Sequence, residues 1–206
     1  AVDERGGLVD GDHILAIAAV DLRARGLLRH DTVVATVMAN LGFHRAMAAE
    51  GIRVETTPVG DRSVLEAMEA GGFSLGGEQS GHVIFGDLAT TGDGLLSGLV
   101  LLEVLARSGR ALSDLASVVV KLPQVLHNVR VADRAGLPGA TAFWDEVAAV
   151  ESDVAGRGRV LVRPSGTEPL VRIMVEAETE EAATAYTDRL TAALTAALGS
   201  GDSPSS

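Results

Sequence analysis

Helical and strand-like patterns alternate through the first 120 residues of the chain. Apolar residues recur at helical spacing over Ile14–Leu22, and the β-branched run Thr32–Val37 follows as a buried strand. We expect Asp12 and Asp61 to cap helices. Later patterns predict helices over 45–50, 62–70 and 94–107, a strand over 52–57, and two short strands flanking 76–82. This order predicts a three-layer α/β domain with a mixed sheet.

A domain boundary is expected near Lys121–Val125, where Pro123 interrupts a strand-like run. Beyond it, strand patterns lie over 125–131, 159–163 and 170–177, and helical patterns over 141–150 and 179–198. These elements predict a smaller α+β domain over residues 123–199. Residues 200–206 (SGDSPSS) have the composition of a disordered tail.

The composition excludes several classes of protein. Without cysteine, the chain has no disulfide, thiolate metal site or cysteine nucleophile. A net charge of −11 and an aromatic content of 3% argue against nucleic acid as a partner. Apolar stretches such as Ile14–Val20 are shorter than the roughly 18 residues that span a bilayer, and the leucine-rich stretch Leu95–Leu105 is assigned to the core. With no apolar leader, the protein is expected to be cytoplasmic.

The segment Arg163–Pro169, called the RPSGTEP turn below, lies between two predicted strands. A turn of this kind can aim consecutive backbone N–H groups at one anion, and Ser165 and Thr167 add hydroxyl donors. The Arg163 guanidinium can grip two phosphate oxygens, and Arg172 on the next strand is a possible second cation. The alternative is an ordinary Pro/Gly hairpin, which is made of the same residue types.

The segment Gly77–His82, called the GEQSGH loop below, is the second candidate for binding. Its glycines let the backbone approach a ligand closely. Glu78 accepts hydrogen bonds, while Ser80 and His82 both donate and accept, which suits recognition of paired sugar hydroxyls. The alternative is a tight turn between two strands that contains a partly buried histidine.

Together, the GEQSGH loop and the RPSGTEP turn about eighty positions later resemble the phosphohexose mutase family. The stretches Val59–Val64 (VGDRSV) and Thr91–Gly94 (TGDG) match other parts of that family. The resemblance runs from Val2 to about Leu198. It implies that the chain is the carboxyl-terminal half of a mutase, and Glu78–His82 favours the family's glucosamine branch over its glucose and mannose branches.

The resemblance also implies a domain order and a site. Family members have four domains: the first bears a phosphoserine, the second a magnesium loop, the third a sugar-reading loop, and the fourth, which is TATA-binding-protein-like, a phosphate-binding loop. Residues 1–8 would then be a remnant of the second domain, 9–122 the third and 123–199 the fourth. The implied substrate-binding residues are Glu78, Ser80, Arg163, Ser165, Gly166 and Thr167, with weaker assignments for Asp61, Arg62 and Arg172 and possible assistance from His82.

The implied reaction interconverts glucosamine 6-phosphate and glucosamine 1-phosphate through a bisphosphate. It uses Mg²⁺ and supplies cell-wall precursors in bacteria. The implied partners are the hexosamine phosphate, the missing amino-terminal half and, as a possibility, a second copy of the chain.

Two of the family's motifs are missing from the chain. It has neither a T-A-S-H-N-P-like phosphoserine loop nor a D-G-D-x-D-R metal loop. Asp10–His13 (DGDH) lacks the third carboxylate and the arginine, so we predict a turn and helix cap there, and a second cap at Asp93. We therefore expect no metal ligands and no turnover from this chain alone. The alternatives are a non-catalytic sugar-phosphate-binding module, a phosphomannomutase or phosphoglucomutase of the same family, and an α/β nucleotide binder, which the missing nucleotide motifs disfavour.

Overall fold

The structure is a computed structural model that describes residues 1–201. The chain divides into two compact units: unit 1, Ala1–Lys121, and unit 2, from Leu122 onward. This division falls beside the proline at which the sequence places a domain boundary. No helix among the described residues is long and apolar enough to cross a membrane.

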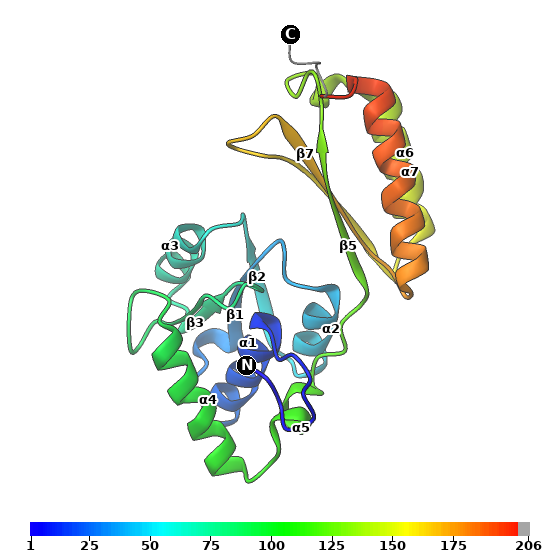
Figure 1. Cartoon of the computed structure of the whole chain (residues 1–206). Helices are drawn as coiled ribbons and strands as arrows, with labels where there is room; N and C mark the ends of the chain where they lie inside the picture. Colours follow the sequence, from blue (N-terminus) through cyan, green and yellow to red (C-terminus); the bar gives the residue numbers. More distant parts are fainter. Residues whose placement is uncertain (202–206) are drawn as a thin grey trace. The chain divides into compact units, whose positions relative to one another are not determined.

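Unit 1 is built on a four-stranded mixed sheet in the order β2-β1-β3-β4 (Figure 1). β1 pairs in parallel with β2 and β3, and β4 pairs antiparallel with β3. The strands are β1 (Thr32–Thr36), β2 (Arg53–Thr57), β3 (Leu75–Gly77) and β4 (Val83–Phe85). The helices are α1 (Gly11–Ala24), α2 (Leu41–Ala49), α3 (Asp61–Gly71), α4 (Gly94–Ser108) and α5 (Leu112–Ala116), with a 3-10 turn η1 (Arg29–Asp31).

Helices cover both faces of this sheet. Val33 of β1 packs with Leu15 of α1 and Phe43 of α2, whereas Val34 packs with Val64 of α3. Side chains alternate along a strand, so every residue of β1 is buried against one helical layer or the other. The predicted three-layer α/β domain with a mixed sheet is therefore confirmed.

Unit 2 has a three-stranded antiparallel sheet with two helices along it. β7 (Leu170–Glu176) lies between β5 (Gln124–Arg130) and β6 (Arg159–Pro164). α6 (Thr141–Asp153), which follows the 3-10 turn η2 (Leu137–Gly139), and α7 (Glu180–Leu198) lie side by side on the sheet (Figure 1). Phe143, Ile173 and Leu190 are wholly buried in the core that these elements share. The α+β class predicted for this half is confirmed.

The structure corrects two predicted helix caps. Asp10 caps α1 by accepting the N–H of His13 at 3.3 Å, while Asp12 lies inside the first turn and is wholly buried. α3 begins at Asp61, with Gly60 as its N-cap at a φ of 126°. Only glycine adopts that conformation readily, and its N–H is held by a side chain of the GEQSGH loop. The cap predicted at Asp93 is confirmed by its bonds to two backbone N–H groups of α4.

Two further predictions differ from the structure. The stretch Leu95–Leu105 is only partly core: Leu101 is buried, but Leu95 is 77% exposed because α4 is apolar around more of its circumference than unit 1 covers. Ser200, placed in the predicted tail, forms a β-bridge with Val131. The rest of that prediction, residues 202–206, lies outside the described residues.

Candidate functional site

The RPSGTEP turn joins β6 to β7 and is closed by its own hydrogen bonds. The Ser165 N–H donates to the Leu170 carbonyl at 2.9 Å. The buried Ser165 hydroxyl accepts the N–H of Glu168 at 3.3 Å. The N–H groups of Gly166 and Thr167, which lie between these bonds, donate to no group in the described part of the chain. The turn therefore presents two neighbouring backbone donors, which is what an anion nest requires.

Two arginines lie at the base of this turn. Arg163 on β6 and Arg172 on β7 are directly opposite each other in the antiparallel register. Neither forms an ion pair with a described residue, and Nε of Arg172 is buried without a hydrogen-bond partner. By contrast, Arg159 on the same strand pairs with Glu176 at 2.9 Å. Burial, together with the charge of Arg172, lowers the pKa of Arg163. Two adjacent cations without a counter-ion favour the binding of an anion.

The GEQSGH loop is a tight turn between β3 and β4. The Glu78 N–H donates to the His82 carbonyl at 2.9 Å, and the Gly81 N–H donates to the Glu78 carbonyl at 3.0 Å. Oε1 of Glu78 accepts the N–H of Gly60 at 3.0 Å, which fixes the carboxylate. Its second oxygen and the exposed Ser80 hydroxyl have no described partner. The loop thus has a fixed backbone and two polar groups available to hydroxyls.

Three other stretches picked out in the sequence meet this loop. Next to Gly60, Oδ2 of Asp61 lies 3.8 Å from Nε2 of His82. A Cβ built on Gly92 would lie 2.4 Å from the His82 ring, so the TGDG stretch packs against that imidazole. The Gly11 N–H donates to the backbone of the loop at 3.1 Å. The fold therefore gathers residues that are far apart in sequence around one turn.

The candidate residues fall into two groups, one in each unit. Unit 1 brings together Glu78, Ser80, His82 and Asp61, and unit 2 brings together Arg163, Ser165, Gly166, Thr167 and Arg172. Arg62 is not directed to the loop, because its Nε donates to Glu66 at 2.7 Å along the exposed face of α3.

The Asp10–His13 segment binds a lysine. The ammonium group of Lys121 contacts the Asp10 carboxylate and lies 3.5 Å from Oδ2 of Asp12. The same Oδ2 accepts the N–H of Asn40 at 3.0 Å, and Oδ1 of Asp12 is buried without a partner. Within residues 1–201, no group of three or more histidines and carboxylates is placed to hold a metal. These residues do not fit Mg²⁺, because an amino group lies where the cation would be needed.

The pKa values of the two carboxyl groups move in opposite directions. Burial raises the pKa of Asp12, and the Asn40 N–H and the charge of Lys121 only partly offset this effect. Burial acts in the same sense on Asp10, but hydrogen bonds from His13 and Lys121 outweigh it and hold the pKa of Asp10 well below its usual range. Lys121 therefore compensates both carboxylates, and His13 adds a hydrogen bond to that of Asp10.

Sequence reasoning did not single out Lys121, Asn40 or Arg134. Lys121 is the only lysine of the chain, but its residue type does not indicate which carboxylates it contacts. Asn40 acts through its backbone N–H, so its residue type gives no signal. Arg134 follows β5 and donates to the backbone carbonyls of the RPSGTEP turn. It lies about thirty residues earlier in the chain, where no motif surrounds it.

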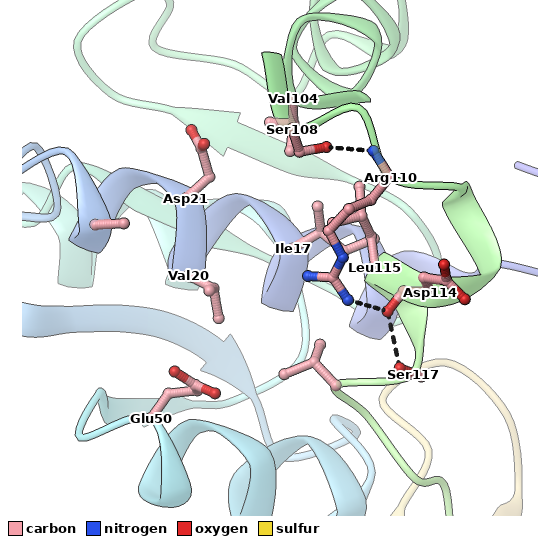
Figure 2. Close-up of a pocket in the computed structure, with 12 residues that line it drawn as sticks. Ile17, Val20, Asp21, Glu50, Val104, Ser108, Arg110, Asp114, Leu115 and Ser117 are labelled. Carbon is pink, nitrogen blue, oxygen red and sulfur yellow. Dashed lines mark hydrogen bonds between the residues drawn. The ribbon is translucent and has the colours of Figure 1, made fainter. Parts of the chain in front are cut away.

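A cavity of about 400 Å³ lies in unit 1 but holds none of the candidate residues. It is lined by the second half of α1, the end of α4, and α5, with Ile17, Val104 and Leu115 among its apolar walls (Figure 2). Arg110 is fixed at its rim by a bond to the Asp114 carbonyl at 2.9 Å. The GEQSGH loop contacts the opposite end of α1, so the cavity is separate from it.

Two family models match the chain in succession. The phosphoglucomutase/phosphomannomutase α/β/α domain III matches residues 10–122, and the C-terminal domain of the same family matches residues 126–193. The chain belongs to the phosphohexomutase family. The two units thus correspond to domain III and the C-terminal domain of a family member, and the recognition made from the two motifs is confirmed.

Several curated relatives are phosphoglucosamine mutases. That of Frankia alni is 59% identical over 198 residues, which cover 96% of this chain and 44% of the relative. That of Oceanobacillus iheyensis is 53% identical over 199 residues, covering 97% of this chain and 45% of the relative. The chain therefore spans less than half the length of these relatives.

Solved structures of other family members share the fold. N-acetylphosphoglucosamine mutase of Aspergillus fumigatus, in complex with GlcNAc-6P and magnesium, aligns with a TM-score of 0.79 at 23% identity. The alignment covers 95% of this chain and 46% of that protein. A phosphoglucomutase/phosphomannomutase family protein from Burkholderia thailandensis aligns with a TM-score of 0.72 at 24% identity, covering 95% of this chain and 43% of that one.

Proposed function

We propose that this chain is the sugar- and phosphate-recognising half of a phosphoglucosamine mutase. In this proposal the complete protein interconverts glucosamine 6-phosphate and glucosamine 1-phosphate through a bisphosphate. The observation that carries it is the pair of uncompensated arginines beside the two free N–H groups of the RPSGTEP turn. The identities to curated phosphoglucosamine mutases support the choice of substrate. The cytoplasmic location and the Mg²⁺ requirement of the complete enzyme stay predictions.

Each unit contributes a different part of the recognition. In unit 2, Arg163 and Arg172 supply charge, and Gly166 and Thr167 supply backbone donors for the phosphate that does not react. In unit 1, Glu78 accepts hydrogen bonds from the sugar hydroxyls, Ser80 accepts or donates them, and His82 beside Asp61 assists. Assignment of the chain's residues as 9–122 for the third domain and 123–199 for the fourth is part of this proposal.

Both parts suit a substrate that binds in two orientations. A mutase that works through a bisphosphate must hold a phosphate at either end of the sugar. A backbone nest with guanidinium groups binds the phosphate anion without contacting the group attached to it. Positioning and charge stabilisation provide most of the acceleration in phosphoryl transfer, and these are the contributions of the residues in this chain.

Glucosamine 6-phosphate should bind to the 206-residue chain in the millimolar range, and Arg163→Ala should weaken binding at least about tenfold. The substitution removes a charge-assisted contact with the phosphate, and Arg172, opposite Arg163, is the described cation that could replace part of it. Isothermal titration calorimetry, or amide chemical shifts of the RPSGTEP turn, would measure it. The matched control is Arg157→Ala in unit 2, whose guanidinium already pairs with Glu178 at 3.1 Å. Equal affinity of wild type and Arg163→Ala would contradict the proposal.

A second candidate, a non-catalytic sugar-phosphate-binding module, is favoured by one observation. The chain contains neither the phosphoserine motif nor the metal motif, so by itself it should bind without turnover. The two candidates differ when the missing half is supplied. Adding the amino-terminal half of a close relative should restore isomerisation of glucosamine 6-phosphate if the chain is a mutase half, whereas a binding module would stay inactive.

A further inference from the structure

Arg134 contacts the RPSGTEP turn from a segment of unit 2 that belongs to none of the sequence motifs. Its Nη1 donates to the Glu168 carbonyl at 3.0 Å and also to the Ser165 carbonyl. These carbonyls belong to the two ends of the four-residue stretch that contains Gly166 and Thr167. We propose that Arg134 is a positioning residue, which fixes this stretch so that its free N–H groups face the bound phosphate. This inference rests on the proposed function.

Peptide geometry gives the direction of the N–H group. The Ser165 carbonyl and the Gly166 N–H belong to one peptide unit, and no peptide bond in the described residues is cis. In a planar trans unit these two groups point in opposite directions. Because Arg134 holds the carbonyl on its own side, the Gly166 N–H points away from Arg134.

Strand alternation places Arg163 on that same far side. A cavity of about 570 Å³ lies on the Arg134 side of the turn, and Val162 and Pro164 line it. Side chains alternate along β6, so Arg163, between these two residues, points to the other face of the sheet. The Gly166 N–H and the Arg163 guanidinium are therefore directed to one side, and Arg134 stands on the other.

Hydrogen bonds fix the turn that contains Arg134. It lies in the turn after β5, where its carbonyl accepts the N–H of Leu137 at 3.3 Å, and Leu137 is buried in the core of unit 2. The carboxylate of Asp133 accepts the Gly136 N–H at 3.1 Å and closes the same turn.

No described carboxylate forms an ion pair with Arg134, and the hydrogen bonds that its Nη1 donates go to the two turn carbonyls. Without the guanidinium, the Ser165 carbonyl would lose its described donor and face the cavity, whereas the Glu168 carbonyl would still accept the N–H of Leu170 at 2.8 Å. The peptide between Ser165 and Gly166 would then be free to rotate.

The test compares Arg134→Ala, Arg134→Lys and the control Arg157→Ala in the whole chain. Arg134→Ala should weaken binding of glucosamine 6-phosphate about tenfold and lower the ¹⁵N order parameters of the Gly166 and Thr167 amides. Arg134→Lys should keep the affinity and the amide order close to those of wild type, because an ammonium group can also bridge two carbonyls. Arg157→Ala should change neither. If Arg134→Ala does not fold, Arg134→Gln, which keeps part of the apolar stem, takes its place.

The order parameters are measured without ligand, so this test is distinct from that of the proposed function. If wild type binds no sugar phosphate, the proposed function fails, while the amide order of Arg134→Ala still decides the role of Arg134. Unchanged order of the Gly166 and Thr167 amides in Arg134→Ala would overturn the inference, whatever the affinity. Lost affinity with unchanged order would assign Arg134 a purely electrostatic effect and would also overturn it.

Discussion

Replacing Gly11 with alanine should lower the free energy of unfolding of unit 1 by about 3 kcal/mol. A Cβ at this position would lie 2.2 Å from the Glu78 carbonyl oxygen, 2.6 Å from that of Gln79 and 2.6 Å from the Gly81 nitrogen. All three atoms belong to backbone, so either α1 or the GEQSGH loop must move. The hydrogen bond from Gly11 N–H to the Gln79 carbonyl, 3.1 Å in length, would be lost with that movement.

The matched control for this variant is Gly98→Ala in the middle of α4. A Cβ at Gly98 would meet no atom within 4 Å, and alanine should stabilise the helix by up to about 1 kcal/mol. The two substitutions should therefore change the free energy of unfolding in opposite directions, because a Cβ at Gly11 would meet backbone atoms and one at Gly98 would meet none. Denaturant titration gives the free energies, and hydrogen exchange of peptides from 75–85 locates the change in the loop. Equal stability of Gly11→Ala and wild type would show that the close approach is not required.

Lys121→Met should destabilise unit 1 by about 3 kcal/mol at neutral pH. The substitution keeps most of the apolar stem but leaves the Asp10 and Asp12 carboxylates without their cation. Asp12 is wholly buried and one of its oxygens already lacks a partner, so the charge cannot be solvated. Removal of one member of a buried ion pair costs more than the pair contributes, because the partner stays buried and charged.

This loss of stability should depend on pH in a defined direction. In wild type the pKa of Asp10 lies below its usual value, so its contribution is present above the ordinary carboxyl pKa and is lost as the pH falls below it. In Lys121→Met the pKa of Asp12, which burial already raises, should rise further, and the variant takes up a proton as the solution is acidified. Both effects reduce the difference between variant and wild type at acidic pH.

The control for the lysine substitution is Arg62→Met. Arg62 pairs with Glu66 on the exposed face of α3, and solvent screens such pairs, so stability should stay within experimental error at every pH. Urea unfolding of the three proteins between pH 3 and pH 8, a range that includes the ordinary carboxyl pKa, would measure the effect. A stability difference for Lys121→Met that stays constant over this range would contradict the role of the two carboxylates.

The sequence determined the class of both units and the position of most elements. Alternating periodicities, β-branched runs such as Thr32–Val37 and glycine stops depend on local chemistry, and the structure reproduces their order. The two motifs were sufficient for the family, which the family models confirm. The roles of Glu78, Arg163 and their neighbours stay predictions.

Only the tertiary structure decided which partners the polar side chains have and which apolar side chains are covered. The N-cap of α1 is Asp10 and not the predicted Asp12. Asp12 is buried and contacts Lys121 and Asn40, which lie far away in sequence. Half of the α4 leucines are exposed, and periodicity could not predict this, because it shows that a helix has an apolar face without showing what covers that face. The contact of Arg134 with the RPSGTEP turn likewise exists only because β5 and β7 pair. Propensity and periodicity are local properties of the chain, whereas the compensation of a buried charge or a backbone carbonyl depends on which distant residue the fold brings beside it.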